Sequence, residues 1–152
     1  MELKIEGIDY TNTLGPWIGK TYKMLDSYME SVLLENNIPV SKQQWVVLNF
    51  IKANDGMNQN ELASFINRDK TSVTRFTNTL LKKGYIEKKC CLKDKRANTL
   101  HISAEGLKIV RETTPVVKEA ILKLQKEVSA EEIEKTISSL KKIQEKITQI
   151  KK

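Results

Sequence analysis

The chain has 152 residues, of which 39% are hydrophobic and 30% are charged, and its formal net charge is +7. This length and composition are typical of one folded domain of 1–152 and exclude a largely disordered protein. Charged residues interrupt the first ten positions, and no apolar run reaches the length of a membrane span. We therefore expect a cytoplasmic protein with no membrane association.

The sequence offers little for catalysis or metal binding. Cys90 and Cys91 are adjacent, and His101 is the sole histidine. This set supports neither a disulfide within the chain nor a structural zinc site. No glycine-rich phosphate loop and no nucleophile elbow occurs. We expect a protein that is not an enzyme and that uses no cofactor.

The positive charge is concentrated in one segment. Between Arg68 and His101 there are ten basic and three acidic residues, which accounts for the whole net charge of +7, and the rest of the chain is balanced. Such a segment is typical of a protein that binds a polyanion. Chance clustering on a solvated surface is the alternative, and charge alone does not decide between them.

The first four predicted elements are helices. Apolar residues at helical spacing predict a helix over 16–36, with a proline in its first turn. Capping boxes open helices over 41–54 and 58–66, because Ser or Asn is followed three residues later by Gln or Glu. A fourth helix over 69–83 ends before Gly84, since glycine readily adopts the left-handed backbone that ends helices.

The pattern then changes from helix to strand and back. Residues 85–91 and 98–102 have a strand-like composition and are joined by the basic loop 92–97, which predicts a β-hairpin. Ser103 caps a fifth helix, which continues beyond Pro115 with a kink or a break there. The predicted fold class is mainly α with a small β-hairpin.

A last helix begins with a capping box at Ser129 and carries an aliphatic seam with heptad-like spacing. The seam comprises Ile133, Ile137, Leu140, Ile143, Ile147 and Ile150. Long amphipathic elements at both ends of so short a chain favour packing between two copies, so we expect 10–36 and 103–152 to be dimerisation helices of a homodimer. The alternative is that both elements cover the central region of their own chain.

A short turn between the third and fourth helices indicates a helix-turn-helix. Ala63, Asn67 and Val73 have the small, turn and apolar character that this unit needs at these positions. The outer face of the fourth helix carries hydroxyls, an amide and cations but no carboxylate, which suits contacts with base edges and phosphates in the major groove of duplex DNA. The predicted DNA-binding residues of this helix are Lys70, Thr71, Ser72, Thr74, Arg75, Asn78 and Lys82.

The tip of the predicted hairpin is also basic. It reads Lys93, Asp94, Lys95 and Arg96, and a projecting loop of this kind can enter the minor groove, with Arg96 as the side chain to insert. Asp94 could hold Arg96 in position through a charge-assisted hydrogen bond. We therefore add these four residues to the predicted DNA-binding set.

Two further groups of residues are open to more than one interpretation. Trp17, Tyr22, Tyr28 and Trp45 could line a pocket for a small-molecule effector, although aromatics at helical spacing more often form core. We interpret His101 as structural or phosphate-facing, because it lies in the alternation of the hairpin.

The order of these motifs resembles the MarR (multiple antibiotic resistance regulator) family. The segments that carry the resemblance are QNELA at 59–63, DKTSVTR at 69–75, LKKGYI at 81–86, DKR at 94–96 and SAEG at 103–106. The resemblance implies a winged helix-turn-helix over 41–102, intertwined terminal helices in a dimer, and binding to a pseudo-palindromic operator, usually as a repressor relieved by a ligand or by oxidation. It assigns DNA contacts to Thr71, Ser72, Thr74, Arg75, Asp94 and Arg96.

Redox sensing and protein binding remain competing hypotheses. Some members of this family sense peroxide through a cysteine, usually nearer the N-terminal helix, and neighbouring lysines could favour a thiolate at Cys90 or Cys91. We prefer to interpret both as small strand residues. The main alternative to specific DNA binding is a protein-interaction module that docks an acidic partner through the winged helix and pairs through its terminal helices.

Overall fold

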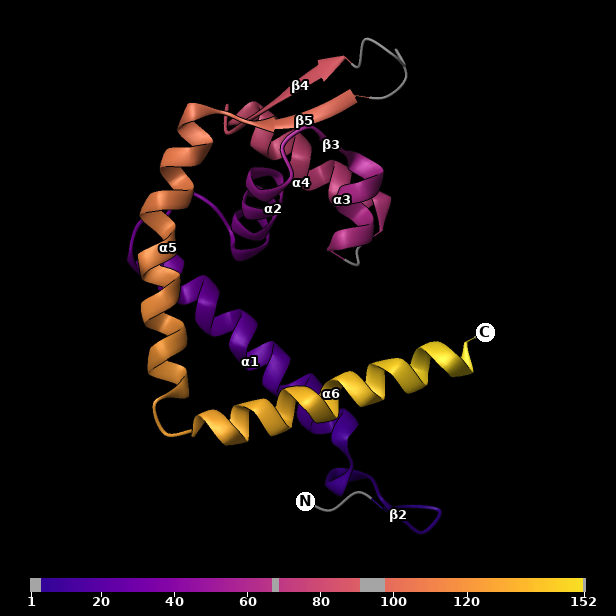
Figure 1. The fold of residues 1–152 in the computed structure, drawn as a ribbon. Helices are drawn as coiled ribbons and strands as arrows, with labels where there is room; N and C mark the ends of the chain where they lie inside the picture. Colours follow the sequence, from indigo (N-terminus) through magenta and orange to yellow (C-terminus); the bar gives the residue numbers. More distant parts are fainter. Residues whose placement is uncertain (1–3, 67–68, 91–97, 152) are drawn as a thin grey trace. The chain divides into compact units, whose positions relative to one another are not determined.

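The computed structural model describes residues 4–66, 69–90 and 98–151 (Figure 1). The chain divides into two compact units, Met1–Val117 and Lys118–Lys152. The helices are α1 Leu14–Glu35, α2 Lys42–Ala53, α3 Gln59–Phe65, α4 Lys70–Lys82, α5 Ala104–Gln125 and α6 Ala130–Ile150. The strands are β1 Lys4–Ile5, β2 Ile8–Asp9, β3 Met57–Asn58, β4 Ile86–Cys90 and β5 Asn98–Ile102, and a 3-10 helix covers Tyr10–Asn12.

Local capping explains where the helices begin and end. The predicted capping boxes at Ser41, Asn58 and Ser129 are all formed, and in each the backbone N–H of the cap residue donates the reciprocal bond to a Gln or Glu side chain. At the end of α4, Gly84 has φ +70° and the backbone N–H of Tyr85 reaches back to the Leu80 carbonyl over 2.9 Å. This is the hydrogen bond that closes a helix through a left-handed residue.

A three-stranded antiparallel sheet packs with α2, α3 and α4 in the first unit (Figure 1). Its strand order is β3-β5-β4, so the predicted hairpin gains a short third strand, which pairs Met57 with Leu100. Strand β3 could not be predicted from its own two residues, because they show no alternation. The N-terminal hairpin of β1 and β2 was missed for the same reason.

The core of the first unit lies among α2, α3, α4, the sheet and the start of α5. Leu48, Ile51, Leu62, Leu80 and Leu100 are each fully buried there. They come from four different elements, so burial of their side chains fixes the packing of the helices against the sheet. A fully buried Leu or Ile side chain typically contributes about 1.5–3 kcal/mol relative to an exposed one.

Helix α5 runs through Pro115 without interruption, so the predicted break does not occur. Proline removes a single backbone donor, and the helix on either side keeps its buried face. Ile109, Val110 and Val117 are buried along this face. Of the helices in the described ranges, none has both the length and the apolarity needed to cross a bilayer.

The start of α5 approaches the backbone of the hairpin very closely. A Cβ atom placed on Gly106 would lie 2.0 Å from the carbonyl oxygen of Tyr85 and 3.0 Å from Ile102 Cγ1. Ser103 fixes the same junction, since its hydroxyl donates to the Gly84 carbonyl over 2.6 Å and accepts from the Gly106 N–H over 3.0 Å. Only glycine fits here, because the obstacle is main chain.

We expect Gly106→Ala to destabilise the protein by about 3 kcal/mol or more, the upper range for overpacking, since the start of α5 must move. Urea unfolding followed by circular dichroism measures this change. Gly19→Ala is the matched control, because a Cβ at Gly19 in α1 meets nothing within 4 Å. It should stabilise by up to about 1 kcal/mol through helix propensity. Equal effects of the two substitutions would contradict the close approach.

Candidate nucleic-acid interface

Helices α3 and α4 form the predicted helix-turn-helix. Ala63 on α3 and Val73 on α4 are both buried, as the motif requires, while Asn67 lies outside the described residues. Helix α4 begins at Asp69, whose carboxylate accepts from the Ser72 N–H over 2.8 Å. This cap fixes the start of α4 a few residues after the end of α3.

A buried polar contact links the two helices. Thr77 is fully buried on α4, and its hydroxyl oxygen accepts a hydrogen bond from the Gln59 side-chain amide over 2.7 Å. The same hydroxyl donates back along its own helix to the Val73 carbonyl over 2.9 Å. Gln59 is the first residue of α3, so this bond joins the beginning of α3 to the middle of α4. Helical periodicity alone places Thr77 in the apolar stripe and gives no sign of this partner.

Side chains on the outer face of α4 line an open depression of about 580 Å³. Six of the seven predicted residues of this helix line it, and Thr79 joins them. The lining is Lys70, Thr71, Thr74, Arg75, Asn78, Thr79 and Lys82. Thr79 could have been found from its spacing, since it follows Arg75 by four residues and therefore lies on the same side of the helix.

Ser72 differs from the other predicted residues. It is partly buried, and its hydroxyl donates to Asp69 Oδ2 over 2.8 Å. Together with the backbone bond from Ser72, this contact lowers the pKa of Asp69 below its usual value. The structure therefore gives Ser72 a place in the cap of α4, at the edge of the exposed face.

The chemistry of the depression is cationic and polar. Its lining contributes three basic side chains, three hydroxyls and one amide, and no carboxylate. The hydroxyl of Thr74 donates to the Lys70 carbonyl over 2.8 Å, which leaves its oxygen able to accept from outside the helix. The Arg75 guanidinium lies 5.4 Å from the centre of the Phe76 ring, a cation–π distance.

The hairpin that follows α4 is formed by β4 and β5, which pair from Ile86–Ile102 to Cys90–Asn98. Its described part is basic on β4, where Lys88 and Lys89 are exposed. The predicted tip residues Lys93, Asp94, Lys95 and Arg96 lie outside the described residues, as does Cys91. Their assignment to DNA contacts stays a prediction.

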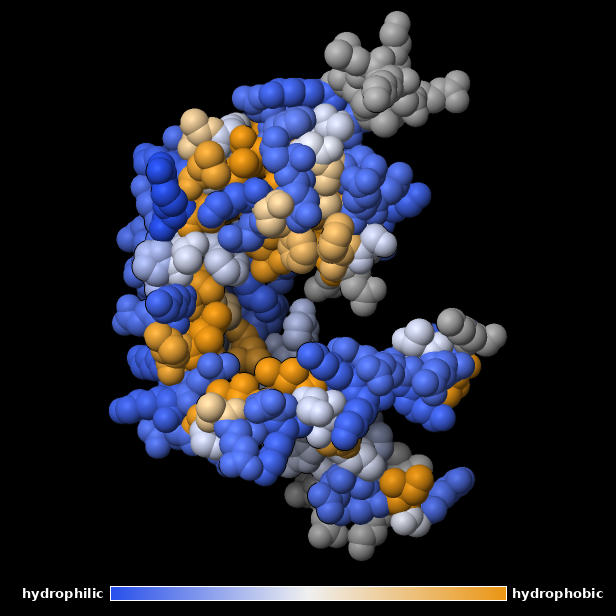
Figure 2. Space-filling view, in the orientation of Figure 1, coloured by the Kyte–Doolittle hydropathy of each residue, from blue (hydrophilic) through white to orange (hydrophobic). Residues whose placement is uncertain are grey.

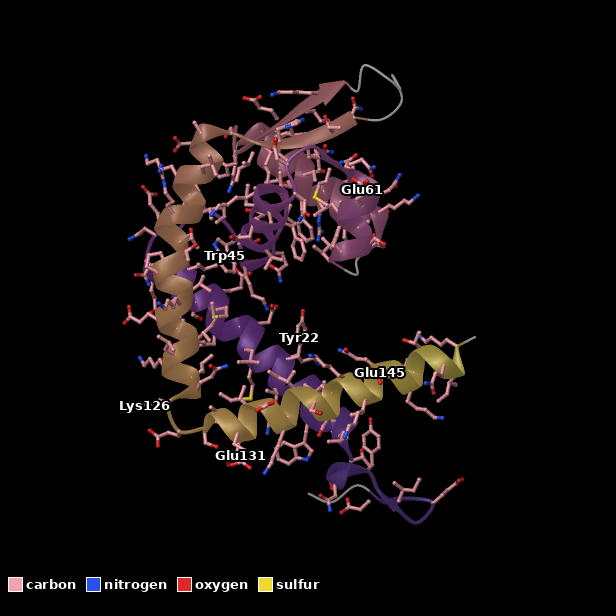
Figure 3. All side chains as sticks on the ribbon, in the orientation of Figure 1. Tyr22, Trp45, Glu61, Lys126, Glu131 and Glu145 are labelled. Carbon is pink, nitrogen blue, oxygen red and sulfur yellow. The ribbon has the colours of Figure 1, made fainter. Side chains whose placement is uncertain are left out.

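The four aromatic residues predicted for an effector pocket do not gather in one place. Tyr22 on α1 lines a small depression of 170 Å³, whereas Trp45 on α2 packs against the core (Figure 3). Trp17 is 60% exposed, and its indole N–H donates to the Thr11 carbonyl over 2.9 Å. Tyr28 is partly buried and is not in the lining of that depression.

The predicted seam of α6 is not buried within the chain. No residue of α6 is buried, and Ile137, Ile147 and Ile150 are 47%, 47% and 72% exposed. The other three seam residues, Ile133, Leu140 and Ile143, are half-buried. Figure 2 shows apolar side chains at the surface of this C-terminal segment. Among the residues that the structure describes, no group of His, Cys, Asp and Glu is arranged to hold a metal ion.

We expect Thr77→Val to destabilise the protein by about 1 kcal/mol, because the half-buried Gln59 amide would lose its partner. Valine keeps the shape of threonine, so the change isolates the hydroxyl. Thr79→Val is the matched control, since its hydroxyl bonds only along the helix to Arg75, and it should change stability by less than about 0.5 kcal/mol. Chemical denaturation of both variants tests the contact, and equal losses would contradict it.

The cap of α4 should make stability depend on pH in the acid range. A carboxyl with a lowered folded pKa contributes stability above its unfolded pKa of about 3.9, and that contribution is lost as pH falls through the folded value. Asp69→Asn keeps an accepting oxygen but removes the charge. Urea unfolding of both proteins from pH 7 down to pH 3 should show their difference shrinking towards acid. A constant difference would contradict the linkage.

Comparison with known proteins finds a family model and several solved structures to which this chain is similar. Residues 40–97 match the MarR family model. The fold is similar to that of a mutant of MarR from E. coli in complex with operator DNA, with a TM-score of 0.80 and 24% identity over 86% of this chain and 92% of that one. It is also similar to S. aureus MepR in a DNA complex (TM-score 0.78, 20% identity, 91% and 99% covered).

A third structure with this fold is the PcaV transcriptional regulator from Streptomyces coelicolor in complex with its natural ligand, with a TM-score of 0.79 and 16% identity over 93% of this chain and 98% of that one. The segment matched by the family model contains α2, α3, α4 and β4. It therefore includes the helix-turn-helix and the exposed face of α4. Over this segment the chain is similar to the MarR family, and its fold is that of the three solved proteins named above.

Proposed function

We propose that this protein binds double-stranded DNA sequence-specifically as a homodimer and represses transcription from a pseudo-palindromic operator until a small ligand relieves it. The observation that carries the proposal is the exposed face of α4. Three cations, three hydroxyls and one amide line one open depression without a carboxylate. Cations position a protein on phosphates, while hydroxyls and amides read base edges.

The family relatives support the DNA part of the proposal. The E. coli and S. aureus proteins with the same fold were solved with DNA. In this chain, Asp69 and Ser72 fix the start of α4, and Gln59 fixes its middle through Thr77. The polar face is therefore held on a rigid element, as base recognition needs.

The homodimer is supported by the apolar residues that the chain leaves uncovered. Large exposed side chains occur on α1 and at the end of α5 as well as on α6, for example Trp17, Leu122 and Ile147. Exposed apolar residues in such number on helical faces are typical of a surface that a partner covers. Two-fold symmetry would place two α4 helices about 10 base pairs apart, centre to centre, along the duplex.

For the effector we propose the depression of 170 Å³ that Tyr22 lines. Its lining is Tyr22, Lys42, Gln43, Val46, Val47, Ile66 and Phe76. Phe76 belongs to α4 and precedes Thr77 in the chain. A molecule that displaces the Phe76 ring therefore also acts on α4, the helix proposed to contact DNA. The volume lies below the roughly 300 Å³ of most small-molecule sites, so the proposed ligand is small and largely apolar.

A DNA-binding measurement tests the proposal. Fluorescence anisotropy on duplex DNA from upstream of the protein's own gene, with unrelated duplex as competitor, should show specific binding. If the dimer neutralises on the order of eight phosphates, log affinity should fall with log salt at a slope of about −7. A slope near zero, or equal affinity for the unrelated duplex, would contradict it and favour the protein-interaction alternative.

Arg75→Ala should weaken specific binding by about 1–3 kcal/mol if Arg75 contacts a base. Arg111→Ala is the matched control, because Arg111 is also an exposed arginine but lies on α5, outside the face of α4. It should leave the affinity unchanged within error. Equal losses from the two variants would show that net charge, and not the face of α4, determines binding.

A further inference from the structure

The sole histidine of the chain lies at the centre of a hydrogen-bonded chain of side chains. His101 is on β5, and its side chain is 21% exposed. Its Nδ1 lies 2.9 Å from Asp55 Oδ2, in the turn between α2 and β3, and its Nε2 lies 3.0 Å from Thr99 Oγ1. The imidazole therefore joins the turn after α2 to the strand that leads out of the hairpin loop.

Thr99 extends this chain across the hairpin. Its hydroxyl donates to the carbonyl oxygen of Lys89, its register partner on β4, over 3.2 Å. Between this link and the loop stands a single further pair, Cys90 with Asn98. The link is therefore placed where it can influence how the two strands present the loop between them.

The one hydroxyl proton of Thr99 cannot form hydrogen bonds with both His101 and Lys89 at once. A threonine hydroxyl donates one hydrogen bond, so it can donate to Lys89 or to His101 but not to both. When the imidazole is doubly protonated, Nδ1–H donates to Asp55, Nε2–H donates to Thr99, and Thr99 is free to donate to Lys89. When Nε2 loses its proton it becomes an acceptor, the Thr99 proton turns to it, and the link to Lys89 is lost.

Several charged groups surround this histidine. Glu87 is its register partner on β4, and Lys89 pairs with Glu87 over 3.9 Å. The hydrogen bond from His101 lowers the pKa of Asp55, so a carboxylate, which can only accept hydrogen bonds, faces Nδ1 at neutral pH.

We propose that Asp55, His101 and Thr99 form a protonation-dependent clamp that links the turn after α2 to both strands of the hairpin, and that the clamp positions the hairpin for DNA binding. The positioning role rests on the proposed function, but the clamp itself does not. Histidine is the side chain that ordinarily changes charge between pH 5 and 8. The clamp closes on protonation, so affinity for DNA rises as pH falls through this range.

Two-dimensional NMR of the full chain tests the clamp without DNA. With one histidine in the sequence, the ring signals are unambiguous. The backbone amides of Lys89 and Thr99 should titrate together with the ring in the wild type and in Thr99→Ser, which keeps the hydroxyl. They should not do so in Thr99→Val. The clamp would be overturned if the amide signals of Lys89 and Thr99 did not change with protonation of the ring, or if they changed equally in Thr99→Val.

DNA affinity as a function of pH tests the positioning role. Wild-type affinity should fall by about fivefold from pH 5.5 to 8, the equilibrium value of one net hydrogen bond. His101→Gln should be flat over this range, and Thr99→Val should resemble the wild type at pH 8, whereas Thr99→Ser restores the slope. Parallel profiles of wild type and His101→Gln would overturn the role. Loss of DNA binding at every pH would overturn the proposed function, while the NMR titration still decides the clamp.

Discussion

The position of α4 against α3 depends on one partly buried hydrogen bond between side chains, together with an apolar core. Leu62, Val73 and Leu80 press α3 against α4, but apolar contacts alone allow helices to slide and rotate. The bond between Gln59 and Thr77 restricts that freedom, because moving either helix takes the half-buried Gln59 amide away from its partner. An exposed face that has to match the spacing of base pairs needs such a restriction.

The same logic extends from α4 to the rest of the first unit. Gly84 ends the helix, Ser103 ties the Gly84 carbonyl to the start of α5, and Gly106 lets α5 approach the Tyr85 backbone. These contacts are short in space, and each involves main-chain atoms, so they tolerate little variation in side chain. Helix α4, the hairpin and α5 are therefore held to one another through backbone geometry as well as through the core.

Much of this architecture could be predicted because its signals are local. The caps at Ser41, Asn58 and Ser129 depend on residues within three positions, and the structure confirms them. Strand β3 depends on Leu100, some forty residues away in the chain, and two residues alone carry no pattern. The partners of Thr77 and His101 were missed for the same reason, since Gln59 and Asp55 reach them only through the fold.

In the candidate interface, too, features set by nearby residues in the sequence could be predicted, and features set by distant residues could not. The polar face of α4 follows from helical periodicity, so six of the seven residues that line its depression were predicted from the sequence. The hydroxyl of Ser72 lies in the cap of α4, and the predicted DNA contact of Ser72 stays a prediction. The effector depression joins α1, α2 and α4, so aromatic character alone selected Tyr22 along with three residues that lie elsewhere. Phe76 borders this depression, and the next residue, Thr77, forms the hydrogen bond with Gln59. A ligand that moves Phe76 would therefore act directly on the contact that orients α4. The proposed DNA-binding face and the proposed ligand site would thus share helix α4.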